Sequence, residues 1–218
     1  MKQTEKSMIR FSGSNPGSPN AANLPEDIPK IGCVIMASGL SKRFGRNKLM
    51  AMYQGKSFIE RALDLTEGLY EERVVLTRSA EIVDTCKSYG VEVILHELEG
   101  RNEAVALGIS EMQGMDACVF CPCDQPLLKR SSVETLTGAF AGSRENSIIR
   151  LSHENLDGTP VLFSKEYFEE LCDLPEKKGG GYLAAKYPEN VIRVQVTDPT
   201  ELWDIDTEED YKKLIEEY

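Results

Sequence analysis

The sequence is short of positive charge, of histidine and of long apolar runs. Its 218 residues include 25 lysines and arginines against 36 aspartates and glutamates, for a net charge of -11, and only two histidines. An acidic chain repels nucleic acids and anionic lipids, so we expect no nucleic-acid partner. No apolar run approaches the roughly 20 residues of a spanning helix. Residues 1–13 also lack the apolar stretch of a secretory signal, so we expect a cytoplasmic protein without a membrane partner.

The six cysteines do not have the spacing of a disulfide framework. Cys33, Cys118, Cys121 and Cys123 lie inside or beside apolar runs that are typical of buried strands. Neighbouring positions of a strand point to opposite faces, which disfavours a zinc site built from the last three. We therefore expect small core residues.

The chain divides into an extension and one folded domain. Residues 1–28 contain the stretch SGSNPGSPNAANLPEDI, which has no apolar periodicity, and we expect a flexible N-terminal arm there. From residue 29 to 218, β-rich runs alternate with segments of helical period, which predicts an α/β domain with a mostly parallel sheet and helices on both faces. The predicted strands are 31–37, 73–77, 91–95, 117–123, 147–151, 159–164 and 191–196, and the predicted helices are 57–67, 80–89, 101–113 and one that begins near Thr207.

The loop after the first predicted strand carries four cations in an acidic protein: Lys42, Arg43, Arg46 and Lys48. It lies at the carboxyl end of that strand, where open α/β sheets bind ligands, and its small residues allow close approach of backbone N–H groups to an anion. We therefore expect a polyphosphate ligand. Two common phosphate motifs are absent, since five residues separate Gly39 from Gly45, where a P-loop has four, and the GxGxxG fingerprint of dinucleotide-binding proteins does not occur.

The same loop resembles the LAAGxSxRxGxxK signature of nucleotidyltransferases, enzymes that join a nucleoside monophosphate to a phosphorylated acceptor. Met36 and Ser38 replace the usual leucine and alanine. The resemblance implies a Rossmann-like three-layer α/β/α nucleotidyltransferase domain. It also implies that the nucleotide is bound by Met36, Ala37, Ser38, Gly39, Ser41, Arg43 and Lys48.

Acidic residues occur in two further segments. One segment directly follows a buried strand, and the other precedes the last helix. Asp124 comes directly after the strand 117–123, at the same sheet edge as the glycine-rich loop, and its carboxylate could bind Mg²⁺. Asp204 and Asp206 lie two residues apart and point the same way in an extended chain. Either could complete the metal site, while the segment from Asp206 to Asp210 also has the spacing of a helix N-cap.

These segments narrow the resemblance to molybdenum cofactor cytidylyltransferases, relatives of molybdopterin guanylyltransferase. Asp124-Gln125-Pro126 resembles the DQP motif of that group, 158–163 resembles its GxPvlf strand, and 204–211 resembles its DIDTPEDY segment. The resemblance covers residues 30–218. It departs at Ala104, where a serine is usual, and at 178–182, where the chain reads KGGGY instead of GDxGxR.

The resemblance implies a Mg²⁺-dependent enzyme that joins CMP from CTP to the phosphate of molybdopterin or molybdenum cofactor and releases pyrophosphate. Its implied catalytic residues are Arg43, Lys48, Asp124 and Asp206, its metal ligands Asp124 and Asp206, and its acceptor-binding residues Gln125, Gly179, Gly180, Gly181 and Asp204. CTP rather than GTP follows from Ser38, because guanylyl-transferring relatives tend to have glycine there. A client molybdoenzyme is a further expected partner.

Two other functions fit the same residues. The acceptor could be a sugar phosphate or another phosphorylated metabolite, which acceptor screening would reveal. Alternatively, the chain could be a catalytically silent carrier of a pterin cofactor, which would bind nucleotide or pterin and release no pyrophosphate.

Overall fold

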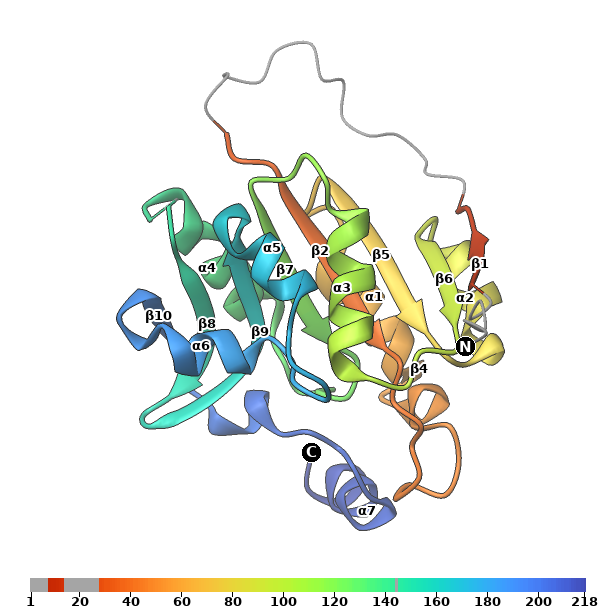
Figure 1. The fold of residues 1–218 in the computed structure, drawn as a ribbon. Coiled ribbons are helices and arrows are strands. Elements are labelled where there is room, and N and C mark those ends of the chain that lie inside the picture. The colour runs from red at the N-terminus through yellow and green to blue at the C-terminus, as the bar shows by residue number, and fades with distance from the viewer. Residues whose placement is uncertain (1–7, 14–27, 144) are drawn as a thin grey trace.

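A single eight-stranded sheet forms the centre of the computed structural model, which describes residues 8–13, 28–143 and 145–218 (Figure 1). The strand order is β1-β6-β5-β2-β7-β9-β8-β10. Strands β2, β5, β6 and β7 run parallel to one another, β10 runs parallel to β8, and β9 is antiparallel to both of its neighbours. The strands are β1 Met8–Phe11, β2 Ile31–Ala37, β5 Glu72–Thr77, β6 Glu92–His96, β7 Ala117–Pro122, β8 Ile148–His153, β9 Leu156–Ser164 and β10 Val191–Gln195.

Helices cover both faces of this sheet, so the predicted three-layer α/β/α fold is confirmed (Figure 1). One apolar core joins the sheet to α1, α2 and α4, and a second joins it to α3, α5 and α6. Successive residues of β2 alternate between the two cores, because strand side chains alternate between faces. The helices are α1 Phe58–Thr66, α2 Val83–Ser88, α3 Arg101–Glu111, α4 Arg130–Ala141, α5 Phe168–Cys172, α6 Gly181–Lys186 and α7 Glu208–Glu217.

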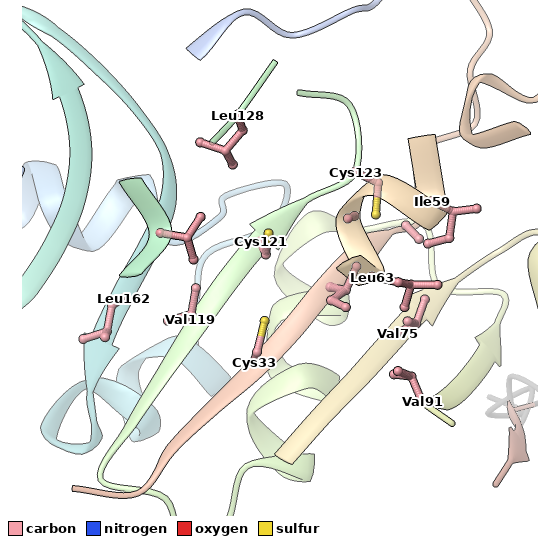
Figure 2. Close-up of a cluster of buried hydrophobic side chains, with 14 of the residues drawn as sticks. Cys33, Ile59, Leu63, Val75, Val91, Val119, Cys121, Cys123, Leu128 and Leu162 are labelled. Atoms are coloured by element: carbon pink, nitrogen blue, oxygen red, sulfur yellow. The ribbon is translucent and has the colours of Figure 1, made fainter. Parts of the chain in front are cut away.

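The buried cysteines belong to these cores. Figure 2 shows Cys33, Cys121 and Cys123 among aliphatic side chains such as Ile59 and Leu63. Cys118 lies on the opposite face of β7, in the second core, and all four are free and buried. Burial raises the pKa of the Cys121 thiol to about 12, which keeps it neutral. The prediction that these cysteines are core residues is confirmed.

Side chains cap the first turns of two helices, and the cap predicted before the last helix is one of them. Ser57 caps α1 in a reciprocal capping box with Glu60, and Thr207 caps α7 in the same way with Asp210. Within the segment from Asp206 to Asp210, which has the spacing of an N-cap, the residues that form the cap are Thr207 and Asp210. The Asp206 carboxylate is therefore available for other partners.

The structure differs from the expected N-terminal arm at Met8–Phe11. These residues form β1, an edge strand antiparallel to β6. Arg10 binds Glu92 of β6 at 2.9 Å and Glu111 of α3 at 2.6 Å. The open hydrogen-bonding edge of β6 accepts any extended segment, so β1 needs little apolar periodicity of its own. Most of the rest of the expected arm lies outside the described residues, namely 1–7 and 14–27.

Two glycines allow close packing, one where α3 lies against the sheet and one in the loop before α6. A Cβ at Gly108 would meet both Val34 methyl groups at 3.0 and 3.1 Å, so this glycine allows α3 to lie close to β2. A Cβ at Gly179 would meet Arg101 Cδ at 2.6 Å. No helix of the described residues is long and apolar enough to cross a membrane.

Candidate active site

The glycine-rich loop begins where β2 ends and returns the chain to the short 3-10 helix Lys48–Met50. Its turn is closed by the amides of Phe44 and Gly45, which donate to Ser41 O at 2.9 and 3.2 Å. Ser41 Oγ accepts from the Lys48 amide at 3.2 Å. Gly45 has φ of +78°, a conformation that glycine adopts without strain.

Phe44 fixes this loop to the carboxyl-terminal part of the chain. Its ring is 1% exposed and belongs to a third apolar core, together with Phe58, Ile205 and Leu214. It also meets Tyr211 of α7 edge to face, with the ring centroids 5.6 Å apart. Because the loop and the segment before α7 share one core, Asp206 next to Ile205 lies beside the loop.

Lys48 joins the two predicted acids. Its Nζ donates to Asp124 Oδ2 at 2.8 Å, to Asp206 Oδ1 at 2.9 Å and to the Ile205 carbonyl at 3.2 Å. Arg43 donates to the other oxygen of Asp206 at 2.7 Å. The backbone adds a further link, since the Ile205 amide donates to Asp124 O at 2.9 Å. Residues 43, 48, 124 and 206, which are far apart in the sequence, thus form one charged cluster at the carboxyl ends of β2 and β7.

The electrostatics favour the charged forms of Lys48 and Asp206. The Lys48 side chain is 9% exposed, and burial would lower its pKa, but hydrogen bonds and charge from Asp124 and Asp206 outweigh burial and raise it. The hydrogen bond from Lys48 lowers the pKa of Asp206 against the opposing effect of its partial burial, and Arg43 adds to that lowering. The Lys48 ammonium therefore stands beside an ionised Asp206.

The donor set of this cluster fits a hard divalent cation. Asp124 and Asp206 each direct one carboxylate oxygen to within 2.9 Å of the same atom, Lys48 Nζ. Carboxylate oxygens are the protein ligands that Mg²⁺ prefers. The two predicted metal ligands thus lie close together, with the Lys48 ammonium at the point on which their oxygens converge.

A second pair of residues, Gln125 and Asp204, lies next to the charged cluster. Gln125 Nε2 donates to Asp204 Oδ1 at 2.9 Å and to Thr159 Oγ1 at 2.8 Å, while Gln125 Oε1 is buried without a hydrogen-bond partner among the described residues. Burial and the neighbouring charge of Asp124 raise the pKa of Asp204. Asp204 and Asp206 therefore have separate partners, although they are two residues apart.

The predicted acceptor glycines lie in the segment that leads into α6, and the first of them, Gly179, lies against the first residue of α3. Gly179 rests against Arg101, Gly180 lies on the Phe163 ring, and Gly181 begins α6. Their contacts are with α3 and β9, so the structure groups them apart from the Lys48 cluster.

The first residues of the predicted nucleotide loop differ in exposure. Met36 is half-buried against the α3 face, Ala37 is buried, and Ser38 is half-buried. Gly39 is exposed, and a Cβ built on it would meet nothing within 4 Å. Neither packing nor a positive φ requires glycine at position 39, whereas close approach of a ligand would.

Sequence reasoning missed several side chains that brace this loop. Thr77 Oγ1 donates to Ala37 O at 3.1 Å, and Asn47 Nδ2 donates to Ser79 Oγ at 2.9 Å. Arg46 proves to be structural, since it stacks on Phe44 and Tyr211 and pairs with Glu208. Asn47 alone had a local signal, because an asparagine before a helical turn is a common N-cap. The other bracing contacts depend on strand pairing.

Comparison with known proteins agrees with this geometry. The model of the MobA-like NTP transferase domain matches residues 33–191. A probable molybdenum cofactor guanylyltransferase of Aquifex aeolicus is 25% identical over 188 residues, which are 84% of this chain and 89% of that protein. Another from Pyrococcus horikoshii is 29% identical over 149 residues, 65% of this chain and 73% of that protein.

Solved structures share the fold. The crystal structure of Rv0371c from Mycobacterium tuberculosis H37Rv superposes with a TM-score of 0.77 at 21% identity, covering 87% of this chain and all of the other. A structure of Rv0371c in complex with manganese superposes with a TM-score of 0.66 at 17% identity, with the same coverage. The family match spans the glycine-rich loop, Asp124 and the β9 strand, and the chain belongs to the MobA-like NTP transferase family.

Proposed function

We propose that this nucleotidyltransferase joins a nucleoside monophosphate to the terminal phosphate of molybdopterin, with or without bound molybdenum, and releases pyrophosphate. The observation that carries the proposal is the convergence of Asp124 and Asp206 on Lys48 beside the glycine-rich loop. The curated relatives, named as probable molybdenum cofactor guanylyltransferases, support the acceptor.

In the proposed reaction an oxygen of the acceptor phosphate attacks the α-phosphorus of the nucleotide, and the bond from that phosphorus to the pyrophosphate oxygen breaks. The barrier comes largely from bringing two polyanions together while negative charge moves onto the leaving group. Lys48 and Arg43 supply positive charge for the triphosphate and for the departing pyrophosphate. Gly39 leaves open space at the loop, so the triphosphate can approach the backbone closely.

Asp124 and Asp206 would hold Mg²⁺, and the manganese complex of a structural neighbour supports a divalent metal in this fold. When bound, the metal would supply a positive charge beside the α-phosphate. Lys48 donates to one oxygen of each carboxylate and so holds the two proposed ligands close together.

The proposed acceptor residues have a feature that suits a pterin. The buried Gln125 Oε1 is a hydrogen-bond acceptor that has no partner in the part of the chain that the structure describes. An unpaired buried acceptor is costly, and an N–H group of the acceptor's heterocycle would satisfy it. Asp204 accepts from the other end of the Gln125 amide, and residues 179–181 would line the acceptor side.

The proposed function predicts the effect of replacing Asp124 with asparagine. Asn keeps the shape of the side chain, and Lys48 retains Asp206 and the Ile205 carbonyl, so Asp124→Asn should keep the fold. Loss of one metal ligand should slow pyrophosphate release by roughly a thousandfold, or about 4 kcal/mol. The measurement is a coupled pyrophosphate assay with molybdopterin, nucleotide and Mg²⁺, alongside the melting temperature.

Asp116→Asn is the matched control. Asp116 precedes the same strand β7 at its opposite end and also pairs with a lysine, Lys165, at 3.0 Å. The control should retain wild-type turnover. Near-wild-type turnover of Asp124→Asn would contradict its proposed role.

Two nucleotides are candidates for the donor. CTP follows from the resemblance of the loop sequence, in which Ser38 stands where guanylyl-transferring relatives tend to have glycine. GTP is favoured by the names of the curated relatives. A competition assay that quantifies CMP and GMP adducts of molybdopterin from an equimolar CTP and GTP mixture decides between them, and we expect the CMP adduct to dominate. A dominant GMP adduct would overturn this donor assignment.

A further inference from the structure

A chain of hydrogen bonds connects His96, at the end of β6, with the first residue of the glycine-rich loop. His96 Nε2 lies 2.8 Å from Ser38 Oγ, and Ser38 Oγ donates to the Leu76 carbonyl of β5 at 3.0 Å. The contacts therefore cross the carboxyl ends of three adjacent strands, β2, β5 and β6. His96 is 2% exposed, so water does not compete for them.

The contacts determine where the protons lie. The Leu98 amide donates to His96 Nδ1 at 3.1 Å, so this nitrogen must be an unprotonated acceptor. A neutral imidazole then carries its proton on Nε2 and donates it to Ser38 Oγ. Since the serine hydroxyl donates its own proton to Leu76, every polar atom of the pair is satisfied, and Ser38 has one fixed orientation.

We propose that His96 is a positioning residue, which through the Ser38 hydroxyl holds the start of the glycine-rich loop in the shape that binds the nucleotide triphosphate. This inference rests on the proposed function for its effect on catalysis. The serine hydroxyl faces inward. Ser38 would therefore contact the ligand through its backbone, while its side chain would fix the position of the loop. On the other side of the same turn, Thr77 holds the Ala37 carbonyl.

The surroundings of His96 keep it neutral. Burial lowers its pKa to about 4, and the positive charge of Arg78 acts in the same direction, while Glu103 of α3 opposes them. The donor to Ser38 is therefore present throughout the pH range in which nucleotidyl transfer is measured.

The test is a double-mutant cycle of His96→Asn, Ser38→Ala and the double variant. Asparagine can still accept from the Leu98 amide, but it is too short to reach Ser38. Hydrogen–deuterium exchange of the peptide covering residues 38–45 should quicken about tenfold in each single variant, and no further in the double variant. His96→Gln, which can extend a donor toward Ser38, should restore slow exchange.

The effect on the ligand is measured separately, by titration calorimetry with CTP and with GTP. The dissociation constant should rise about tenfold in both single variants, with no additional rise in the double. His153→Asn is the control, because the other histidine bonds to the Val196 carbonyl at 3.0 Å and lies at the opposite end of the strand order.

Unchanged loop exchange in Ser38→Ala and His96→Asn, or additive effects in the double variant, would overturn the positioning role. Ser38→Ala removes only an oxygen atom, so it supplies this answer even if His96→Asn does not fold. An enzyme that releases no pyrophosphate with any nucleotide would instead refute the proposed function, and the exchange result would still decide whether His96 orders the loop.

Discussion

At the scale of single residues, Gly39 is a position where the fold does not require glycine but close contact with a ligand would. Its φ is not in the left-handed region, and a side chain there would meet open space. The fold therefore tolerates a methyl group at position 39, but a triphosphate lying against the loop backbone would not.

Gly39→Ala should leave the free energy of unfolding within about 0.5 kcal/mol of wild type, because no protein atom is displaced. It should weaken CTP binding by at least tenfold. Urea unfolding and calorimetry measure the two quantities. Gly138→Ala is the comparison, since Gly138 lies exposed inside α4 with free space around it, and alanine there should stabilise by about 0.5–1 kcal/mol without changing CTP affinity. Unchanged CTP affinity in Gly39→Ala would contradict nucleotide contact at this glycine.

At the scale of elements, helix caps decide which acids remain available for chemistry. Thr207 and Asp210 satisfy the first turn of α7, so Asp206 can turn to Arg43 and Lys48. The cap of α1 is not part of the charged cluster. There Ser57, through both its amide and its hydroxyl, donates to Glu60 Oε2 at 2.7 and 2.5 Å.

The cap of α1 should make a pH-dependent contribution to stability. The hydrogen bonds from Ser57 lower the pKa of Glu60 below its usual value of 4.5. A carboxyl with a lowered native pKa stabilises the fold above its unfolded pKa, and this stabilisation is lost as the pH falls through the native value. Ser57→Ala should therefore cost about 1 kcal/mol at pH 7 and less at pH 3, by urea unfolding. Glu60→Gln, which cannot titrate, should remove this pH dependence; an equal cost of Ser57→Ala at both pH values would contradict the ionised cap.

At the scale of the whole molecule, the edge that carries the proposed active site and the β1 edge are separate parts of one sheet. The charged cluster is built on β2, β7 and the segment before α7, whereas β1 lies at the end of the strand order, beyond β6. Strand β1 is mostly exposed and contributes little to the core, but it covers the hydrogen-bonding edge of β6.

A chain that starts at Ile28 should therefore keep nucleotidyl transfer within about twofold of the full chain, because no residue of the cluster is removed. It should aggregate more readily, since the uncovered edge of β6 offers unpaired backbone groups to other molecules. Light scattering at increasing protein concentration measures the association. Arg10→Ala in the full chain is the control, which removes the ion pairs to Glu92 and Glu111 and keeps the strand. A truncated chain that stays monomeric, or one that folds and loses activity, would contradict this assignment.

The sequence by itself determined the elements around the site. Local apolar runs and caps fixed β2, β7, α1 and α7 within a residue or two, because alternation and N-cap chemistry act between neighbours in the chain. Small residues and cations after β2, and acids after β7, also indicated the sheet edge on which the charged residues lie.

Only the tertiary structure decided which of those charges meet. Lys48 contacts both Asp124 and Asp206 because Phe44 and Ile205 share an apolar core, and His96 reaches Ser38 because β6 and β2 flank β5. The pairing of β1 with β6 likewise depends on an open strand edge. Such contacts join residues many positions apart, and their energies arise from packing and strand order, which no local pattern encodes.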